Sequence, residues 1–189
     1  AHCSFCYREE LIARKEIKRE DGTVASKGTA KISELVNYIL EHNKLVEENG
    51  GRHPKTNRER LREILMSGGD PMVLPNSKLA EWFSSLADAG IESIRLGTKE
   101  LAFYPNRFDS AFLNMIDNFN SAYPEVQLRI MIHFNHPDEF LQKDADGKYI
   151  DNPDGGLVWI ESTRRAVKEL AKRNFVTIEN QAPFIKGIN

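Results

Sequence analysis

Two cysteines near the start of the chain are the residues whose type and spacing most directly predict chemistry. Cys3 and Cys6 form a Cys-x-x-Cys pair and are the only cysteines among the 189 residues. Such a pair can supply half of a zinc site, a redox-active dithiol, or the last two ligands of an iron–sulfur cluster. Two cysteines this close together cannot staple a domain of this size, which indicates a reducing compartment and thiols kept for chemistry.

Two histidines offer a second pair of metal ligands. His133 and His136 are three residues apart, and together with Cys3 and Cys6 they would make a Cys₂His₂ zinc set in a non-enzymatic zinc-binding or regulatory domain. The two pairs lie about 130 residues apart, which is not the spacing of a zinc finger. His136 also precedes Pro137, which places it in a turn rather than on a helix.

The elements that must position these groups are predicted from hydrophobic periodicity. Helical spacing of apolar residues predicts four helices, and short apolar or alternating runs predict four strands. In the second helix, Asn76 is the expected N-cap and Gly90 the expected end. The predicted helices are 32–40, 76–89, 112–119 and 159–171; the predicted strands are 64–66, 94–97, 126–134 and 175–182; and the predicted polar, irregular stretches are 10–30, 44–60 and 144–156.

The order of these elements predicts the fold class. Helices and strands alternate regularly, which argues for an α/β protein with parallel strands joined by right-handed crossovers. Polar groups follow each predicted strand, at residues 67–70, 97–99, 133–136 and 180–181, on the edge where parallel barrels and open α/β sheets bind ligands. Because groups from every strand appear together there, we favour an incomplete (β/α) barrel over a flavodoxin-like open sheet.

Composition excludes several classes of partner. Lys and Arg total 26 against 28 Asp and Glu, so no excess of positive charge is available to hold a phosphate backbone, and nucleic acid is not an expected partner. No apolar run reaches the length of a membrane span, and the first residues do not have the pattern of a signal peptide. A small-molecule ligand and a cytoplasmic location are therefore expected.

Five ordered motifs are more specific together than any one of them. They are residues 3–6 (Cys-Ser-Phe-Cys), 67–71 (Ser-Gly-Gly-Asp-Pro), 94–99 (Ile-Arg-Leu-Gly-Thr-Lys), 133–137 (His-Phe-Asn-His-Pro), and 180–183 (Asn-Gln-Ala-Pro) followed by 187–189 (Gly-Ile-Asn). In order and spacing this set resembles the radical S-adenosylmethionine (SAM) enzymes of the lysine 2,3-aminomutase family. The family pattern is Cys-x-x-x-Cys-x-x-Cys, so its first cysteine is expected upstream of Ala1.

The resemblance implies a role for each motif. Cys3 and Cys6 would be two of three thiolate ligands of a [4Fe–4S] cluster, at which SAM is reductively cleaved to a 5′-deoxyadenosyl radical. Arg8 would bind the substrate carboxylate through its planar guanidinium. Asp70 or a nearby backbone carbonyl would take the ammonium group of SAM. The residues implied to contact SAM are Phe5, Ser67, Gly68, Gly69, Asp70, Thr98, Lys99, His133, Asn135 and Gln181.

The resemblance also implies the wider reaction. The radical would serve 2,3-amino migration on lysine or a related amino acid, with an electron donor such as flavodoxin or ferredoxin and with pyridoxal phosphate (PLP) held by a lysine outside this chain. An enzyme of the same lineage that works without PLP on another substrate is the alternative. Residues 1–189 would be a radical SAM core fragment lacking flanking strands, with a cluster loop at 1–10 and a polar loop or insertion at 44–60, inactive by itself and poorly stable because two sheet edges are uncovered. A homo-oligomer is a further expectation.

Overall fold

A computed structural model describes residues 16–18, 24–26 and 31–181. The chain divides into two compact units, residues 1–60 and 61–189. In the first unit, strands β1 (Glu16–Lys18) and β2 (Val24–Ser26) pair antiparallel, with Ile17 opposite Ala25. The sequence prediction of an irregular stretch over residues 10–30 was therefore wrong at these six positions. Strands of three residues are too short to show a periodic pattern.

Helix α2 (Ile32–Glu48) and the segment 49–60 that follows it make up the rest of the described part of the first unit. The helix is longer than predicted: residues 44–48, predicted as polar loop, continue the helix because Val46 lies on the same buried face as Ile39. The remaining polar stretch folds back onto α2. The ring of His42 bonds the carbonyl oxygen of Glu59 at 2.9 Å and stacks on the ring of His53 with centroids 4.8 Å apart.

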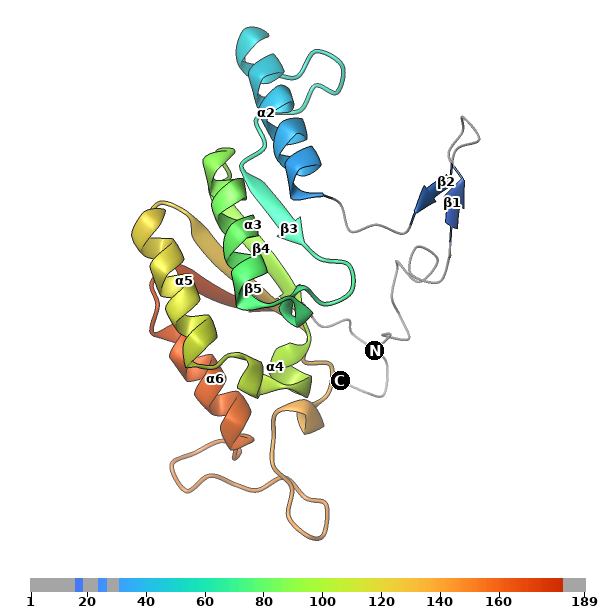
Figure 1. Cartoon of the computed structure of the whole chain (residues 1–189). Coiled ribbons are helices and arrows are strands. Elements are labelled where there is room, and N and C mark those ends of the chain that lie inside the picture. Colours follow the sequence, from blue (N-terminus) through green and yellow to red (C-terminus); the bar gives the residue numbers. More distant parts are fainter. Residues whose placement is uncertain (1–15, 19–23, 27–30, 182–189) are drawn as a thin grey trace. The chain divides into compact units, whose positions relative to one another are not determined.

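The second unit is built on a four-stranded parallel sheet of order β3-β4-β5-β6 (Figure 1). The alternation of strands and helices predicted from the sequence is confirmed. The strands are β3 (Glu63–Met66), β4 (Ser93–Thr98), β5 (Gln127–Ile132) and β6 (Val176–Asn180); the helices between them are α3 (Asn76–Asp88), α4 (Glu100–Phe103), α5 (Ser110–Ala122) and α6 (Glu161–Ala171); and the short 3₁₀ turns are η1 (Pro71–Val73), η2 (Pro105–Arg107) and η3 (Pro137–Glu139).

The strand order decides between the two predicted architectures. Within the four described strands of this sheet, each strand pairs with the next one along the chain, and the order does not reverse as it does in a doubly wound open sheet. Sequential parallel strands with helical crossovers are the construction of a (β/α) barrel. The fold is therefore α/β, consistent with the partial barrel that we favoured.

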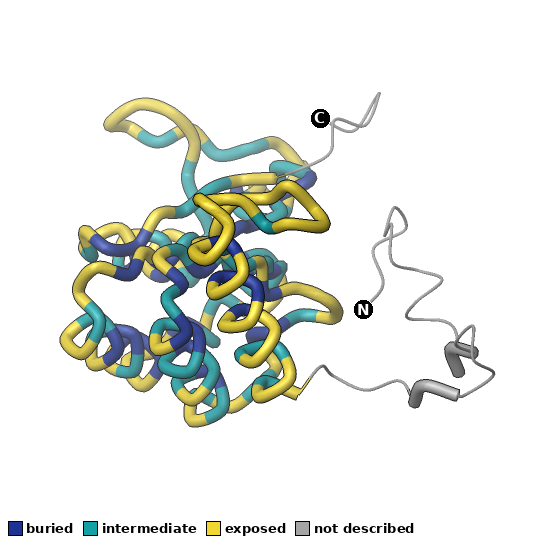
Figure 2. The backbone as a smooth tube through the Cα atoms, turned by 90° about the horizontal axis from the view of Figure 1, so that it is seen from above, coloured by how far each residue is buried: buried dark blue, intermediate teal, exposed yellow. Residues whose placement is uncertain are grey.

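The core lies between the helices and one face of the sheet. Side chains in register across the strands, such as Ile94 and Leu128 in one row and Leu96 and Ile130 in the next, are fully buried. From α3 and α5, Phe83 and Phe119 meet with ring centroids 5.4 Å apart. Figure 2 shows that the buried positions of the helices and strands face inward, while the connecting loops are largely exposed.

Helix ends follow local chemistry, with one correction. The predicted N-cap Asn76 is instead the first residue of α3, Pro75 occupies the cap position without a side-chain bond, and the buried Asn76 Oδ1 has no partner. Gly90 ends α3 as predicted, with φ of 85° and its N–H bonded to the carbonyl oxygen of Ala87. Asp109 caps α5 by accepting from the N–H of Phe112 at 2.8 Å.

The loop between β5 and α6 is more ordered than a polar stretch suggests. Isolated antiparallel bridges join Leu141 to Trp159, Lys143 to Tyr149 and Asp151 to Leu157, so the predicted irregular stretch 144–156 folds into a paired extension. At its base the rings of Phe140 and Trp159 lie 5.1 Å apart. Among the described residues, no helix is long and apolar enough to cross a membrane.

Candidate active site

Four strand ends meet at one edge of the sheet and bring the predicted site residues together. Parallel pairing aligns Thr98 with Ile132 and Ile132 with Asn180, so the segments that follow β4, β5 and β6 leave the sheet side by side. The C-terminal edge of parallel strands is where such folds place ligand-binding groups. Hydrogen bonds and one ion pair connect the segment after β3 to the end of β4, that end to the segment after β5, and that segment to the end of β6.

Residues 67–74, which we call the glycine loop, follow β3. Gly68 and Gly69 have φ of 103° and 69°, in the left-handed region that glycine tolerates best. A Cβ on Gly69 would meet no atom within 4 Å, so its backbone conformation, and not crowding, favours glycine there. Ser67, Gly68 and Gly69 are exposed, which leaves their backbone groups accessible to a ligand.

Asp70 joins the glycine loop to the end of β4. Its carboxylate accepts from the hydroxyl of Thr98 at 2.8 Å and from the backbone N–H of Lys99 at 2.7 Å. It also accepts from the N–H of Met72 at 3.0 Å and so caps η1. Because three protein groups donate to it, this carboxylate holds the glycine loop against the end of β4. Which of the two predicted groups, Asp70 or a backbone carbonyl, accepts the ammonium group of SAM stays a prediction.

Lys99 continues the connection to the segment after β5. Its ammonium lies 3.4 Å from Oε1 of Glu139, and both side chains are largely buried, at 15% and 20% exposure. Oε2 of Glu139 accepts from the backbone N–H of Asn135 at 2.8 Å. The Lys99 ammonium also lies 4.6 Å from the centroid of the Phe103 ring. The charge of Lys99 is thus neutralised within the protein.

Asn135 carries a group that the described protein leaves unsatisfied. Its side chain is buried, and its Oδ1 atom has no hydrogen-bond partner. A buried acceptor without a partner costs free energy unless a donor reaches it, so it fits a ligand that donates a hydrogen bond at this edge. The neighbouring His133 is half-buried, and the N–H and C=O of Phe134 bond to the side chain of Asn180 at 3.0 and 3.3 Å.

Gln181 extends the edge at β6. Its backbone N–H donates to the carbonyl oxygen of Ile132 at 2.8 Å, and the residue is exposed. Seven of the SAM-contacting residues that were predicted from the sequence lie on three connected segments at this edge, and Gln181 lies beside them. These are Ser67, Gly68, Gly69, Asp70, Thr98, Lys99 and Asn135.

The roles of three residues that organise this edge were not predicted from the sequence. These residues are Arg107, Glu139 and Asn180, whose side chain bonds the backbone of Phe134. Arg107 donates from Nε to the carbonyl oxygen of Met72 at 2.8 Å and from Nη2 to that of Leu74 at 2.9 Å. Its partners are backbone atoms more than 30 positions away in the sequence, and no local pattern indicates them. The position of Glu139 just after His136 and Pro137 was the one available signal.

The glycine loop also has a distinct electrostatic neighbour. Burial raises the pKa of Glu100, and the nearby negative charge of Asp70 raises it further, whereas Arg107 acts in the opposite direction. Glu100 itself follows Lys99 directly, and its N–H donates to the Thr98 hydroxyl oxygen at 3.0 Å. The carboxylate of Asp70 and the guanidinium of Arg107 therefore act on Glu100 in opposite directions.

The predicted cluster ligands and their neighbours lie outside the described residues. These are Cys3, Phe5, Cys6 and Arg8, and their roles stay predictions. Among the residues that the structure does describe, no group of three or more His, Cys, Asp and Glu side chains could hold a metal ion. The zinc hypothesis therefore depends on Cys3 and Cys6, as the cluster hypothesis does.

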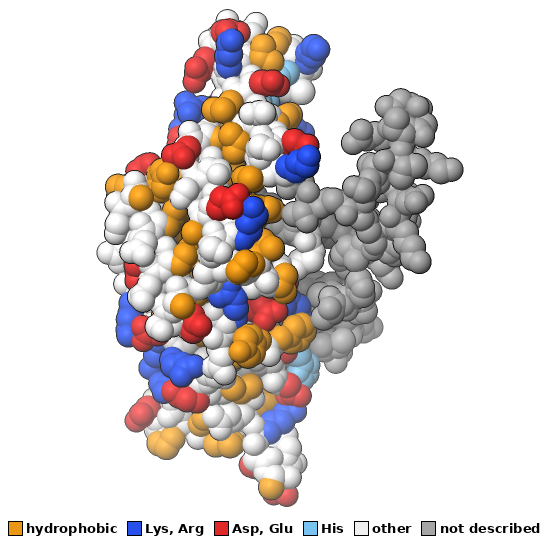
Figure 3. Space-filling view, in the orientation of Figure 1, with side chains coloured by type: hydrophobic (Ala, Val, Ile, Leu, Met, Phe, Trp, Pro, Cys, Tyr) orange, Lys and Arg blue, Asp and Glu red, His pale blue; other side chains and the backbone are white. Residues whose placement is uncertain are grey.

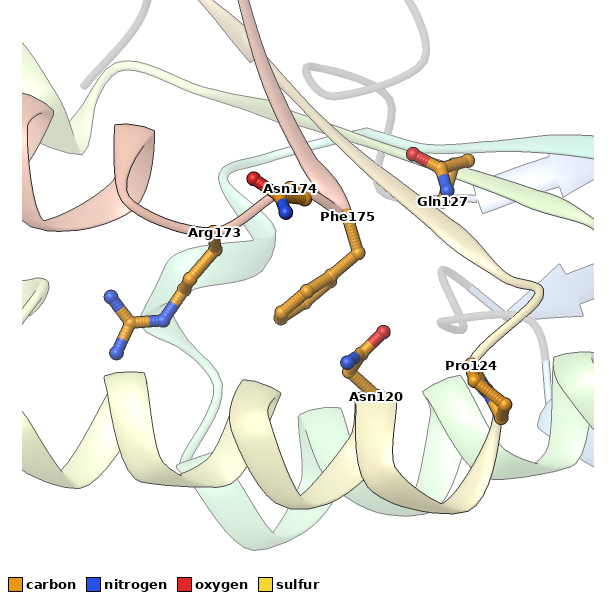
Figure 4. Close-up of a pocket in the computed structure, with 6 residues that line it drawn as sticks. All are labelled: Asn120, Pro124, Gln127, Arg173, Asn174 and Phe175. Atoms are coloured by element: carbon orange, nitrogen blue, oxygen red, sulfur yellow. The ribbon is translucent and has the colours of Figure 1, made fainter.

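The opposite edge of the sheet has a different character. A hollow of about 360 Å³ lies at the N-terminal ends of β5 and β6. Figure 4 shows its lining, with amide side chains around Phe175. Arg173 at its rim is engaged with Asp117 at 2.7 Å. On the face seen in Figure 3, acidic and basic side chains are intermixed over the second unit, without a basic stripe. The residues that line the hollow are Asn120, Pro124, Gln127, Arg173, Asn174 and Phe175.

Comparison with known proteins finds relatives that are named as 2,3-aminomutases. No family model matches the chain. It is 31% identical over its whole length to a provisionally named L-lysine 2,3-aminomutase of Aquifex aeolicus, covering 39% of that protein. It is 27% identical over its whole length to a glutamate 2,3-aminomutase of Clostridioides difficile, covering 33% of it. Over 68% of the chain it is 30% identical to an L-lysine 2,3-aminomutase of Fusobacterium nucleatum, covering 24% of that enzyme.

The fold is a partial (β/α) barrel with its polar groups at the C-terminal edge. The chain is a distant homologue, along its whole length, of proteins named, one of them provisionally, as lysine and glutamate 2,3-aminomutases. It spans roughly a third of the length of these relatives.

Proposed function

We propose that this chain supplies the cluster- and SAM-binding part of a radical SAM enzyme that acts on an amino acid. The observation that carries the proposal is the connected C-terminal edge, where hydrogen bonds and the Lys99–Glu139 ion pair join the glycine loop, the end of β4, the segment after β5 and the end of β6 in a homologue of aminomutases. When bound, a [4Fe–4S] cluster and SAM would supply the radical chemistry by reductive cleavage of a carbon–sulfur bond.

The residues at this edge suit the binding of SAM. The exposed backbone of Ser67, Gly68 and Gly69 can approach the methionine end of the ligand closely and accept its ammonium group. The unpartnered Oδ1 of Asn135 can accept from an amino or hydroxyl group of the adenosine moiety. Lys99 and Asp70 are engaged with the protein, so they hold these segments in place and leave the site without a free charge of their own.

Cys3 and Cys6 would hold two corners of the cluster, and Arg8 would hold the substrate carboxylate. Soft thiolate ligands favour iron–sulfur clusters, and a planar guanidinium binds a carboxylate through two parallel bonds. The substrate is proposed to be an amino acid, with lysine and glutamate as the first two to test because relatives are named for them. PLP, a flavodoxin or ferredoxin donor, a homo-oligomeric state and a cytoplasmic location complete the proposal.

The test uses the protein at its full natural length, purified without oxygen and reconstituted with iron and sulfide. We expect about four irons per chain and formation of 5′-deoxyadenosine from SAM on reduction. Cys6→Ser should lose both iron and SAM cleavage, whereas the matched control Ser4→Ala, in the same loop, should keep them. Absence of a cluster and of SAM cleavage in the wild-type protein would contradict the proposal.

Two further measurements separate the alternatives. Stoichiometric zinc in the anaerobically purified protein, with no iron uptake, would favour the zinc-binding domain. If SAM is cleaved, the visible absorbance of a PLP Schiff base after addition of PLP distinguishes the aminomutase from the enzyme without PLP. Conversion of lysine or glutamate to the 3-amino isomer would then identify the substrate.

A further inference from the structure

The glycine loop is held from two sides, by one carboxylate and one guanidinium. On the first side, Asp70 bonds the Thr98 hydroxyl and the Lys99 N–H at 2.8 and 2.7 Å, which fixes the start of the loop to the end of β4. Both of its partners are themselves constrained, because Thr98 is 2% exposed and Lys99 is paired with Glu139. The first side of the loop is therefore fixed relative to the sheet.

On the second side, Arg107 binds the far half of the loop. Its Nε and Nη2 atoms donate to the carbonyl oxygens of Met72 and Leu74 at 2.8 and 2.9 Å. These carbonyls lie at the end of the short turn η1, where the helical pattern leaves acceptors without intrahelical partners. The guanidinium carbon also lies 5.5 Å from the centroid of the Phe112 ring, so the side chain is supported from α5.

The chemistry of Arg107 is specific to this task. A guanidinium presents two N–H groups in a fixed plane and can satisfy two carbonyls at once, whereas a lysine ammonium is a point charge on a flexible stem. Glu100 lies near both Asp70 and Arg107. The positive charge of Arg107 therefore also stabilises the negative charge of the Glu100 carboxylate.

We propose that Arg107 is a positioning residue for SAM: it acts through the carbonyls of Met72 and Leu74 to hold the glycine loop, while Asp70 acts through β4. In this assignment neither side chain touches SAM, and the ammonium group of SAM is accepted by a backbone carbonyl of the loop. The assignment rests on the proposed function, because it concerns the same ligand.

The experiment measures 5′-deoxyadenosine formation by the full-length reconstituted protein carrying Arg107→Met or Arg107→Lys. Because small misplacements of a positioning group weaken binding strongly, we expect Arg107→Met to raise the KM for SAM about 10- to 100-fold, with kcat at saturating SAM changed less than about 3-fold. Arg107→Lys should rescue part of the loss. Arg165→Met is the matched control, since Arg165 bonds Asn106 of η2 at 2.7 Å without contact to the loop.

A second readout does not depend on catalysis. Hydrogen exchange of the peptide covering residues 67–75 should become at least about 10-fold faster in Arg107→Met, because the loop loses one of its two attachments, and should be unchanged in Arg165→Met. Arg107→Lys should show a smaller increase. Unchanged KM for SAM together with unchanged exchange in both Arg107 variants would overturn the assignment. If the wild-type protein cleaves no SAM, the proposed function fails, and the exchange measurement alone still decides whether Arg107 holds the loop.

Discussion

The two faces of the sheet carry opposite chemistry on the same strands. Ile130 and Arg129 are neighbours on β5, yet Ile130 is fully buried in the apolar core and Arg129 lies on the other face among charged side chains. There Arg129 joins Glu63 of β3 at 2.7 Å and Glu179 of β6 at 2.6 Å, and Arg95 of β4 also contacts Glu63 at 3.2 Å. One face is held by packing and the other by a network of paired charges.

The difference shows what each face contributes. The apolar face excludes water and supplies most of the stability, because burial of apolar area dominates the free energy of folding. The charged face joins all four strands laterally with balanced charge, two arginines against two glutamates. In a (β/α) barrel the face opposite the helices points inward, so this network indicates a polar barrel interior below the candidate site.

The largest effect is expected on the apolar face. Ile130→Ala should lower the free energy of unfolding by about 2–5 kcal/mol, because it removes a fully buried side chain and leaves a cavity. Chemical denaturation of the chain measures this value. Val73→Ala, at a position that is 74% exposed, is the control and should change it by less than about 0.5 kcal/mol. Equal effects of the two substitutions would contradict the placement of the core.

A smaller, salt-dependent effect is expected on the charged face. Arg129→Met should lower the denaturation midpoint by less than Ile130→Ala does, because the half-exposed ion pairs it removes are partly screened by solvent. The difference from wild type should shrink as salt is added, since mobile ions screen such pairs. Arg164→Met, which breaks an exposed pair on α6, is the control and should show little change at either salt concentration.

Acid should weaken the charged face through Glu63. Burial raises the pKa of Glu63, but hydrogen bonds from Ser93, Arg95 and Arg129 outweigh it, so the pKa lies below its ordinary 4.5. A carboxyl with a lowered pKa stabilises the fold above its unfolded pKa, and this contribution is lost as pH falls through the folded pKa. Midpoints measured between about pH 6 and pH 3 should therefore fall less steeply in Glu63→Gln than in wild type. If the midpoints of Glu63→Gln and of the wild type fall equally between about pH 6 and pH 3, Glu63 is not part of the network.

The smallest effect is expected at Thr177, the exposed neighbour of Ile178 on β6. It lies in register with Arg129 on the charged face, but no hydrogen bond of its side chain joins the network. Thr177→Ala should change the free energy of unfolding by less than about 0.5 kcal/mol, as surface substitutions generally do. A loss as large as that of Ile130→Ala would mean that this face is packed rather than polar.

Much of the fold was predictable because its signals are local. The alternation of Val126, Leu128, Ile130 and Ile132 predicted the buried row of β5, and all four side chains are buried. The C-terminal part of α2 was missed because its buried face includes polar residues such as His42, which interrupt a purely hydrophobic pattern. Strands β1 and β2 were missed because three residues carry no period.

The candidate site was predictable only in part. Gly68, Gly69 and Asp70 predict a tight loop after a strand, and the position of this loop at the sheet edge follows from the strand order. The bonds that organise the edge were not predictable, because Arg107 and Glu139 reach backbone groups and side chains brought close only by the tertiary fold. The balance of charge on the charged face depends in the same way on which strands become neighbours.

The sequential strand order also bears on how the protein is made. Each strand from β4 to β6 pairs with the strand that precedes it in the chain. A ribosome releases the N-terminal part first, so every new strand emerges next to an edge that is already available to it. The sheet can grow in the direction of translation without waiting for a distant segment, and at each stage the last strand made is the template for the next.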